Sequence, residues 1–254
     1  MEISAGFPTY GDEMLLKCCV NGPRLGFEHP ALPVTPDQIA RATADAQAAG
    51  AGAVHLHAKL ADGHDTLDPQ HVGDAVRAVR AACPGLAVGV TTGAWAEPDP
   101  ERRRDQIMSW RERPDFASVN WHEEGANDVA RALLEQDIGV EAGLWSADAV
   151  DAWLDSPLRD KHLRVLLELA DGMNEDDVHE AADDMLDRLH GRTELPVLLH
   201  GAGTSAWPAY HYAVRMGLDT RIGLEDTLEL PDGTTARDNA ALVHAARVMA
   251  GSHV

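Results

Sequence analysis

Short apolar runs recur along the whole chain and are separated by longer, partly polar stretches. Eight of these runs have the length and composition of β-strands, and they occupy residues 14–20, 53–58, 86–92, 116–120, 139–144, 163–169, 196–200 and 220–224. Most are continuously apolar rather than alternating, which is typical of parallel strands covered on both faces. The pattern therefore predicts a parallel sheet with helices packed against it.

Signals for the start of a helix follow several of these runs. Thr35 stands before Pro36, and Gln38 follows at the third helical position, so the sequence predicts an N-cap with a capping box. Asp68 and Asp99 each precede a proline in the same way. The predicted helices run from 36 to 50, from 69 to 84, from 100 onwards, and over 128–136, 146–153, 178–189, 206–216 and 238–249.

The predicted strands and helices alternate, and the strands start at intervals of about 30 residues. Eight β–α units in 254 residues predict a single-domain TIM barrel over residues 1–254. A doubly wound open sheet is the alternative fold. The turn after the first strand, residues 21–24, lacks the glycine pattern of dinucleotide-binding folds, so it gives that alternative no support.

Polar residues close nearly every predicted strand at its C-terminal end, which is the end where TIM barrels carry their active sites. A polar mouth over an apolar barrel explains this arrangement better than chance does. The residues are Asn21, His55, His57, Thr91, Thr92, Asn120, Glu141, Glu168, His200, Glu225 and Asp226.

Two histidines on the second strand, His55 and His57, suggest a metal site. A spacing of two residues puts both imidazoles on one face of a strand, where they can bind zinc or a similar ion. Glu225 can supply a third ligand, and the adjacent Asp226 is then left for proton transfer. Structural roles are the alternative, since strand ends also carry hydrogen-bonded histidines and carboxylates. Thr91 can equally be an ordinary β-branched strand residue.

Two further groups of residues near the mouth have open interpretations. Four tryptophans follow strand ends and either pack beneath the rim or form an aromatic wall for a substrate tail. They are Trp95, Trp121, Trp145 and Trp207. Two acidic pairs, at residues 123–124 and 183–184, are predicted to be solvated.

Composition and charge exclude several classes of function. The formal net charge of −21 argues against nucleic acid or an anionic membrane as a partner, because both attract positive charge. No apolar run is long enough for a membrane-spanning helix, and the N-terminus lacks the features of a secretory signal. Cys18, Cys19 and Cys83 have no metal-type spacing and are predicted to be buried, reduced thiols, which fits a cytoplasmic setting.

Several motifs together resemble the β-keto acid cleavage enzymes, the family that includes 3-keto-5-aminohexanoate cleavage enzyme. The resemblance covers nearly the whole chain, in order. Its segments are Asn21–Gly22, residues 29–36, residues 55–57 with Asp62–Gly63 and Asp68–Pro69, Thr92–Gly93, residues 140–145, and above all residues 221–226, followed by 230–233 and 239–243.

The resemblance implies a TIM barrel and a retro-Claisen type reaction, in which a β-keto acid and acetyl-CoA give acetoacetate and a new acyl-CoA. It implies zinc held by His55, His57 and Glu225, with Asp226, Arg221 and Thr91 as catalytic residues. It also implies a homo-oligomer. The residues that we predict to bind substrate are Asn21, Arg24, Thr92, Gly93, Asn120, Glu141 and Trp121.

The chain departs from the family at two places. Arg24 stands where the aminohexanoate enzyme has an acidic residue, which favours an anionic or neutral substrate over an amino-substituted one. Residues 121–124 replace a small, glycine-containing turn, so binding of CoA needs testing. Two other functions stay open: a metal-dependent TIM-barrel hydrolase acting without CoA, and a non-catalytic barrel that binds a metal or ligand.

Overall fold

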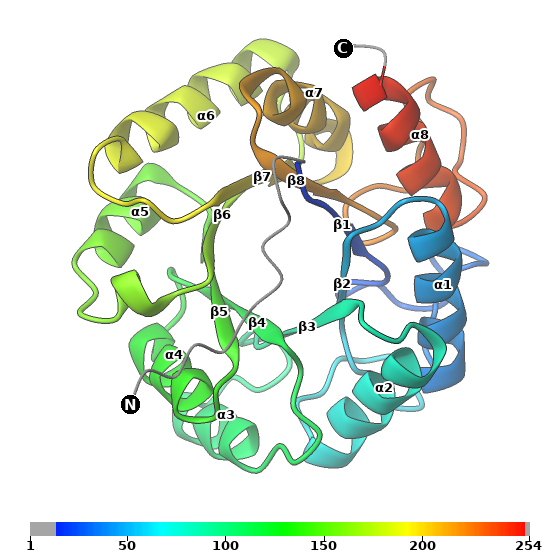
Figure 1. Cartoon of the computed structure of the whole chain (residues 1–254), viewed down its shortest axis with the longest axis vertical. Coiled ribbons are helices and arrows are strands. Elements are labelled where there is room, and N and C mark those ends of the chain that lie inside the picture. The colour runs from blue at the N-terminus through cyan, green and yellow to red at the C-terminus, as the bar shows by residue number, and fades with distance from the viewer. Residues whose placement is uncertain (1–13, 252–254) are drawn as a thin grey trace.

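The computed structural model describes residues 14–251, and within them eight parallel strands form a closed barrel in the order of the sequence (Figure 1). This confirms the predicted TIM barrel. The N-terminus on which the prediction about a secretory signal rests lies outside the described residues. The strands are β1 (Leu16–Cys19), β2 (Ala53–Leu56), β3 (Ala87–Thr91), β4 (Phe116–Asn120), β5 (Gly139–Leu144), β6 (Arg164–Leu169), β7 (Val197–Gly201) and β8 (Asp219–Ile222).

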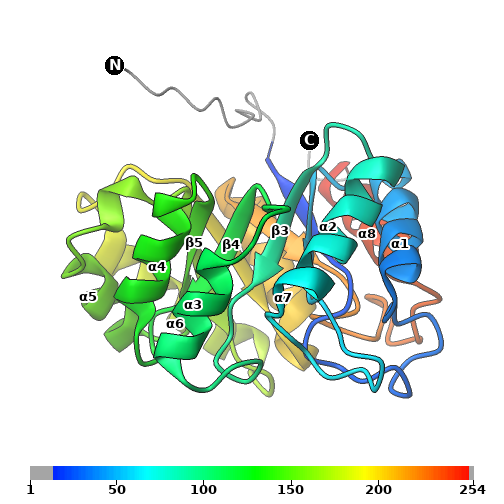
Figure 2. The ribbon, with the colours of Figure 1, turned by 90° about the horizontal axis from the view of Figure 1, so that it is seen from below.

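Helices surround the barrel on its outside, as Figures 1 and 2 both show. Together with the side chains that fill the barrel, they bury the strands on both faces, which explains the continuous apolar runs in the sequence. The helices are α1 (Pro36–Ala48), α2 (Pro69–Ala82), α3 (Pro100–Met108), α4 (Ala126–Glu135), α5 (Ala147–Leu154), α6 (Glu175–Leu189), α7 (Ala206–Met216) and α8 (Asn239–Gly251), with short 3₁₀ turns at Arg159–Lys161 and Gly203–Ser205. Among the described residues, no helix is long and apolar enough to cross a membrane.

The predicted helix caps are confirmed. The Thr35 side chain accepts from the backbone N–H of Gln38, whose own side chain completes the capping box. Asp68 and Asp99 accept backbone N–H groups at the start of α2 and α3, as predicted, and Ser146 does the same at the start of α5. Because these caps satisfy donors that a helix leaves unpaired, they fix where each helix starts relative to the strand before it.

One difference from the predicted elements concerns the site directly: β8 ends at Ile222 rather than at residue 224. The backbone N–H groups of Asp226 and Thr227 donate to the carbonyl of Gly223, so the chain turns directly after the strand. A Cβ on Gly223 would lie 2.0 Å from the Cys19 carbonyl oxygen, so this approach to β1 requires glycine. The turn places Glu225 and Asp226 at the barrel mouth.

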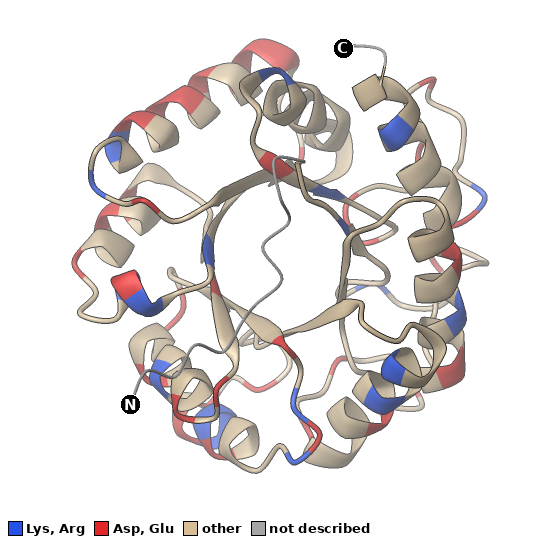
Figure 3. Ribbon diagram, viewed as in Figure 1, with Lys and Arg blue, Asp and Glu red and all other residues tan. Residues whose placement is uncertain are grey.

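Charged residues lie mainly on the helices and loops, and acidic segments are most frequent along α6 (Figure 3). The predicted solvation of the pair on α6 is confirmed, because Asp183 and Asp184 are exposed. The prediction for Glu123 is wrong. Its carboxylate accepts from the Ala94 N–H and from Asn120, and it forms an ion pair of 2.7 Å with the buried Arg103. The turn after β4 is therefore tied to the β3 loop and to α3.

A buried ion-pair cluster lies inside the barrel towards the N-terminal ends of its strands. Lys17 of β1 contacts Glu141 of β5 at 2.6 Å, and both side chains are fully buried. Arg164, the first residue of β6, contacts the other oxygen of Glu141 at 3.2 Å and Asp219, the first residue of β8, at 3.0 Å. Mutual pairing compensates the cost of burying these charges.

His162 is enclosed by two tryptophans and accepts a hydrogen bond of 3.0 Å from the Trp153 indole N–H. Burial lowers the pKa of His162 from 6.5 to about 4. Between these values the unfolded chain binds a proton that the folded chain does not, so the free energy of unfolding falls as the pH falls. The loss amounts to about 2 kcal/mol at pH 5.

Urea unfolding of the wild type and of His162→Gln at pH 7 and pH 5 tests this prediction. The wild type should lose about 2 kcal/mol more than the variant, since all the other titrating groups are common to both proteins. An equal loss in the two proteins would assign the acid sensitivity to other groups.

Candidate active site

A pocket of about 250 Å³ opens at the C-terminal ends of the strands. It brings together many of the polar residues that the sequence placed at the mouth, and two of the four tryptophans. Its lining includes His55, His57, Thr91, Trp95, Ser118, Asn120, Trp145, Glu168, His200, Arg221, Glu225 and Asp226.

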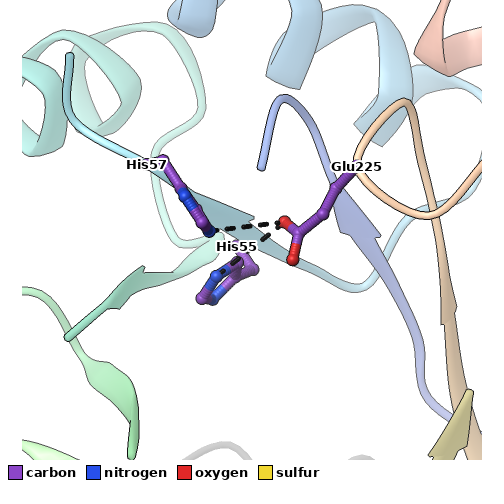
Figure 4. Close-up of side chains that lie close together, drawn as sticks. All are labelled: His55, His57 and Glu225. Atoms are coloured by element: carbon purple, nitrogen blue, oxygen red, sulfur yellow. Dashed lines mark ion pairs between the residues drawn. The ribbon is translucent and has the colours of Figure 1, made fainter. Parts of the chain in front are cut away.

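Three of these residues form a cluster that can hold a metal ion (Figure 4). The Nε2 atoms of His55 and His57 lie 3.9 and 3.7 Å from Oε2 of Glu225, and one ligand atom from each residue lies within 4.8 Å of the others. Oε2 of Glu225 is buried and has no hydrogen-bond partner among residues 14–251. Two imidazoles and one carboxylate are the donors of many catalytic zinc sites. The residues present therefore fit such an ion.

The charges of these side chains suit a metal ligand set. Burial lowers the pKa of His55 well below its usual value, which keeps its imidazole neutral. Burial raises the pKa of Glu225, but attraction to nearby cationic charge, that of the Arg221 guanidinium foremost, outweighs burial and brings this pKa to about 2. A neutral His55 imidazole beside an ionised Glu225 carboxylate is the form in which these two groups bind a divalent cation.

The site lies across the seam where the barrel closes. β1 pairs with β2 on one side and with β8 on the other, so it separates the histidines from Glu225. Gly22, directly after β1, has φ of +57°, and a Cβ there would lie 2.4 Å from Cγ of Glu225. Only glycine satisfies both the backbone angle and the close approach.

Arg221 and Asp226 form a second arrangement beside the cluster. The Arg221 guanidinium donates to Oδ1 of Asp226 at 3.0 Å and to Oε1 of Glu225 at 2.9 Å. Oδ2 of Asp226 is buried and has no hydrogen-bond partner in the part of the chain that the structure describes. Burial raises the pKa of Asp226, and the neighbouring Glu225 adds to this, while Arg221 and His200 oppose it. This carboxylate can accept a proton from a substrate in the pocket.

His200 and Glu168 complete the polar wall behind Asp226. His200 lies 3.4 Å from Glu168 through Nε2 and 3.7 Å from Asp226 through Nδ1. The sequence placed both residues at the mouth without giving them a role. It missed Ser118, which shares a strand face with Asn120 two residues on, and that spacing is a usable signal.

Asn120 is the predicted substrate-binding residue that lines the pocket, and the other six lie outside it. Asn21 exchanges hydrogen bonds with the His57 backbone at 2.9 Å and so fixes the end of β2. Arg24 donates to the Leu224 carbonyl oxygen at 2.7 Å, and Thr92 donates to the Ser118 carbonyl oxygen at 2.7 Å. These three side chains support the backbone around the site.

Three others are separated from the pocket by packing. Gly93 lies beneath Trp95, where a Cβ would meet the indole ring at 2.3 Å. Trp121 is 6% exposed and packs on His162 with a ring-centroid distance of 5.0 Å. Glu141 is held in the ion-pair cluster inside the barrel. None of these three residues lines the pocket, so the pocket gives no support to the prediction that they bind substrate.

The aromatic wall is made by Trp95 and Trp145, which line the pocket and are 47% and 43% exposed. The Trp145 indole N–H donates to Oδ1 of Asn120 at 3.2 Å. Trp207 lies elsewhere, in a surface groove with residues of α7, and its indole N–H donates to the Glu229 carbonyl oxygen. The two tryptophans of the wall thus differ from Trp121 and Trp207 in facing the pocket.

The chain is similar to known proteins both in sequence and in fold. A family model described as beta-keto acid cleavage enzyme matches residues 13–253. The 3-keto-5-aminohexanoate cleavage enzyme of Fusobacterium nucleatum is 23% identical over 91% of this chain and 89% of its own length. The 3,5-dioxohexanoate:acetyl-CoA acetone transferase of Paraburkholderia graminis is 27% identical over 86% and 83% of the two chains. Among solved structures, the apo structure of ObcA superposes with a TM-score of 0.70 at 19% identity, over 87% of this chain and 62% of that one.

Proposed function

Because this chain belongs to the β-keto acid cleavage enzyme family, we propose that it uses acetyl-CoA and a bound zinc ion, or a similar divalent metal, to convert a β-keto acid into acetoacetate and a new acyl-CoA. The observation that carries the proposal is the arrangement of Asp226. Arg221 holds one of its oxygens, and the other has no hydrogen-bond partner within the described residues and lies beside three residues that fit a metal. The name of the Paraburkholderia graminis relative supports acetyl-CoA as the second substrate.

The proposed reaction exchanges acyl groups and needs no oxidant or reductant. Asp226 removes a proton from the carbon between the keto and carboxylate groups, and this carbon attacks the thioester carbonyl of acetyl-CoA. The carbon–sulfur bond breaks and CoA leaves as a thiolate. The thiolate attacks the original keto carbon, the bond to the acidic carbon breaks, and Asp226 returns its proton to that carbon.

Other residues of the chain orient the reacting groups. Arg221 holds Asp226 and stays charged, because its guanidinium lies between two carboxylates. Thr91 accepts a hydrogen bond of 3.1 Å from the Gly93 N–H, which leaves its hydroxyl proton available to a substrate oxygen. When bound by His55, His57 and Glu225, the metal would supply Lewis acidity towards the keto oxygen.

The form of the pocket supports a keto acid with a short, uncharged tail. Trp95, Trp145 and Leu169 contribute apolar surface to a cavity of about 250 Å³. Arg24 does not line this pocket. The uncharged substrate tail is therefore inferred from the apolar lining alone. The predicted homo-oligomer and the cytoplasmic setting stay predictions.

The test is an activity screen of the purified, metal-analysed protein with a panel of β-keto acids, with and without acetyl-CoA, reading acetoacetate. Formation of acetoacetate that requires both metal and acetyl-CoA is expected. Equal consumption of keto acid without acetyl-CoA would instead support the hydrolase, whose water-activating step needs no thioester. Absence of both turnover and bound metal would contradict an enzymatic role.

Replacing Trp145 with alanine is expected to raise the KM for 3-oxooctanoate about tenfold more than that for 3-oxopentanoate, since apolar contact with the longer tail is lost. Steady-state kinetics with both substrates measures this. Trp121→Ala is the control: it should lower the stability by about 3–5 kcal/mol, because Trp121 is buried, and leave the ratio of KM values unchanged. A ratio unaffected by Trp145→Ala would remove this indole from the substrate wall.

A further inference from the structure

Asp65 occupies a position that the sequence did not single out, next to the candidate metal ligands. It lies on the returning arm of a short hairpin, bridged to Lys59 and turned at Gly63, which has φ of +90°. Its side chain is 3% exposed. Oδ2 is 2.6 Å from Nδ1 of His57 and accepts the Trp95 indole N–H at 2.8 Å, and Oδ1 accepts from Lys59 at 2.6 Å.

The contact with His57 determines what that imidazole can do. A carboxylate at Nδ1 keeps the ring proton on this nitrogen, so Nε2, which faces Glu225, presents its lone pair. A carboxylate in this position also fixes the orientation of the ring and makes it a more basic ligand. In the described residues, His55 differs, because its Nδ1 is buried without a partner.

The same carboxylate holds one wall of the pocket. The Trp95 ring stacks on His57, with a centroid distance of 5.9 Å and an interplanar angle of 17°. Its indole N–H shares Oδ2 of Asp65 with His57, so the indole is fixed over the ligand while its other face remains exposed. Any shift of Asp65 therefore moves the ligand and the wall together.

Lys59 extends this arrangement to the loop after β1. Its ammonium, buried like Asp65, also donates to the carbonyl oxygens of Gly22 and Arg24 at 2.8 and 3.0 Å. Gly22 is the residue that contacts Glu225, so the loop that places the third ligand is linked to the group that orients the second.

We propose that Asp65 is the positioning residue of this site: it orients His57 for metal binding and, through the same oxygen, holds Trp95 as a wall of the substrate pocket. The inference rests on the proposed function in so far as the site binds a metal. It assigns Asp65 no contact with substrate.

The test measures zinc affinity by competition with a chromogenic chelator in the wild type, in Asp65→Asn, and in Asp62→Asn. Asp62 is an exposed carboxylate on the same hairpin and serves as the matched control. Asp65→Asn should bind zinc about 10–100-fold more weakly, and Asp62→Asn as tightly as the wild type. The tryptophan emission of Asp65→Asn should also change, and this change should be absent when both proteins carry Trp95→Phe.

Loss of Asp65 leaves the buried Lys59 unpaired, which can destabilise the fold. The double variant Asp65→Asn/Lys59→Met removes both charges, and it should bind zinc about 10–100-fold more weakly than Lys59→Met alone, which lacks the same Lys59 hydrogen bonds but keeps Asp65. Zinc affinity unchanged by Asp65→Asn in both backgrounds would overturn the inference alone. A wild type that binds no zinc would instead contradict the proposed function.

Discussion

Asp226→Asn should lower kcat by about 10³-fold while the protein keeps its metal. The substitution preserves the volume of the side chain and its hydrogen bond from Arg221, but it removes the oxygen that can take a proton. The change therefore separates proton transfer from binding. Metal analysis and steady-state kinetics with a β-keto acid and acetyl-CoA measure the two properties.

A second measurement assigns the loss to the proton-transfer step. The wild type should exchange the acidic hydrogens of the keto acid with D₂O faster than the uncatalysed rate even without acetyl-CoA, and Asp226→Asn should not. Asp232→Asn, in the loop that follows, removes an exposed carboxylate and should leave turnover unchanged. Near-normal turnover of Asp226→Asn would show that another group is the base.

His55→Ala should abolish stoichiometric metal binding and lower activity by about 10³-fold or more, because the cluster retains two of its three donors and the loss of metal removes several kcal/mol of transition-state stabilisation. The fold should remain, at a cost of about 1–3 kcal/mol for the vacated volume. Metal content by atomic spectroscopy and circular dichroism measure the two effects.

His64→Ala is the matched control for this variant, since His64 is exposed on the hairpin that follows β2. It should keep full metal content and activity. Zinc retained at one equivalent by His55→Ala would refute the metal assignment, and an unfolded variant would call for His55→Gln in its place.

The fold could be predicted almost completely from local patterns. Apolar runs fix the strands because each is buried on both faces, and caps such as Thr35 and Asp68 fix where the helices begin. The error at β8 arose because Gly223 and Leu224 continue the apolar run. The contact of Gly223 with β1, which ends the strand, joins residues about 200 positions apart and leaves no local signal.

The candidate site could be predicted as far as strand ends determine position. His55, His57, Glu225 and Asp226 lie together because parallel strands place their C-terminal ends at one face. Depth within the barrel could not be predicted in the same way. Glu141 is polar and on a strand like the others, but its depth and its distant partner Lys17 place it inside the barrel.

The side chains of loops were the least predictable. Trp121 and Trp145 each follow a strand, yet one packs inward on His162 and the other lines the pocket. The position of Asp65 beside His57 could not be predicted, because it requires the hairpin to fold back on the end of β2. Such contacts depend on how a loop closes, which composition alone does not determine.

The position of the site across the seam between β1 and β8 has a consequence for how the protein is made. The histidines emerge early in synthesis and Glu225 near its end, so a ribosome-bound chain that lacks its last unit cannot assemble the full ligand set. β1 and β8 are the paired strands that lie farthest apart in the sequence. Their pairing closes the longest segment of chain, so it carries the largest loss of conformational entropy among the strand pairings. A metal bound there would add its binding free energy to that late step and stabilise the closed barrel against opening between β1 and β8.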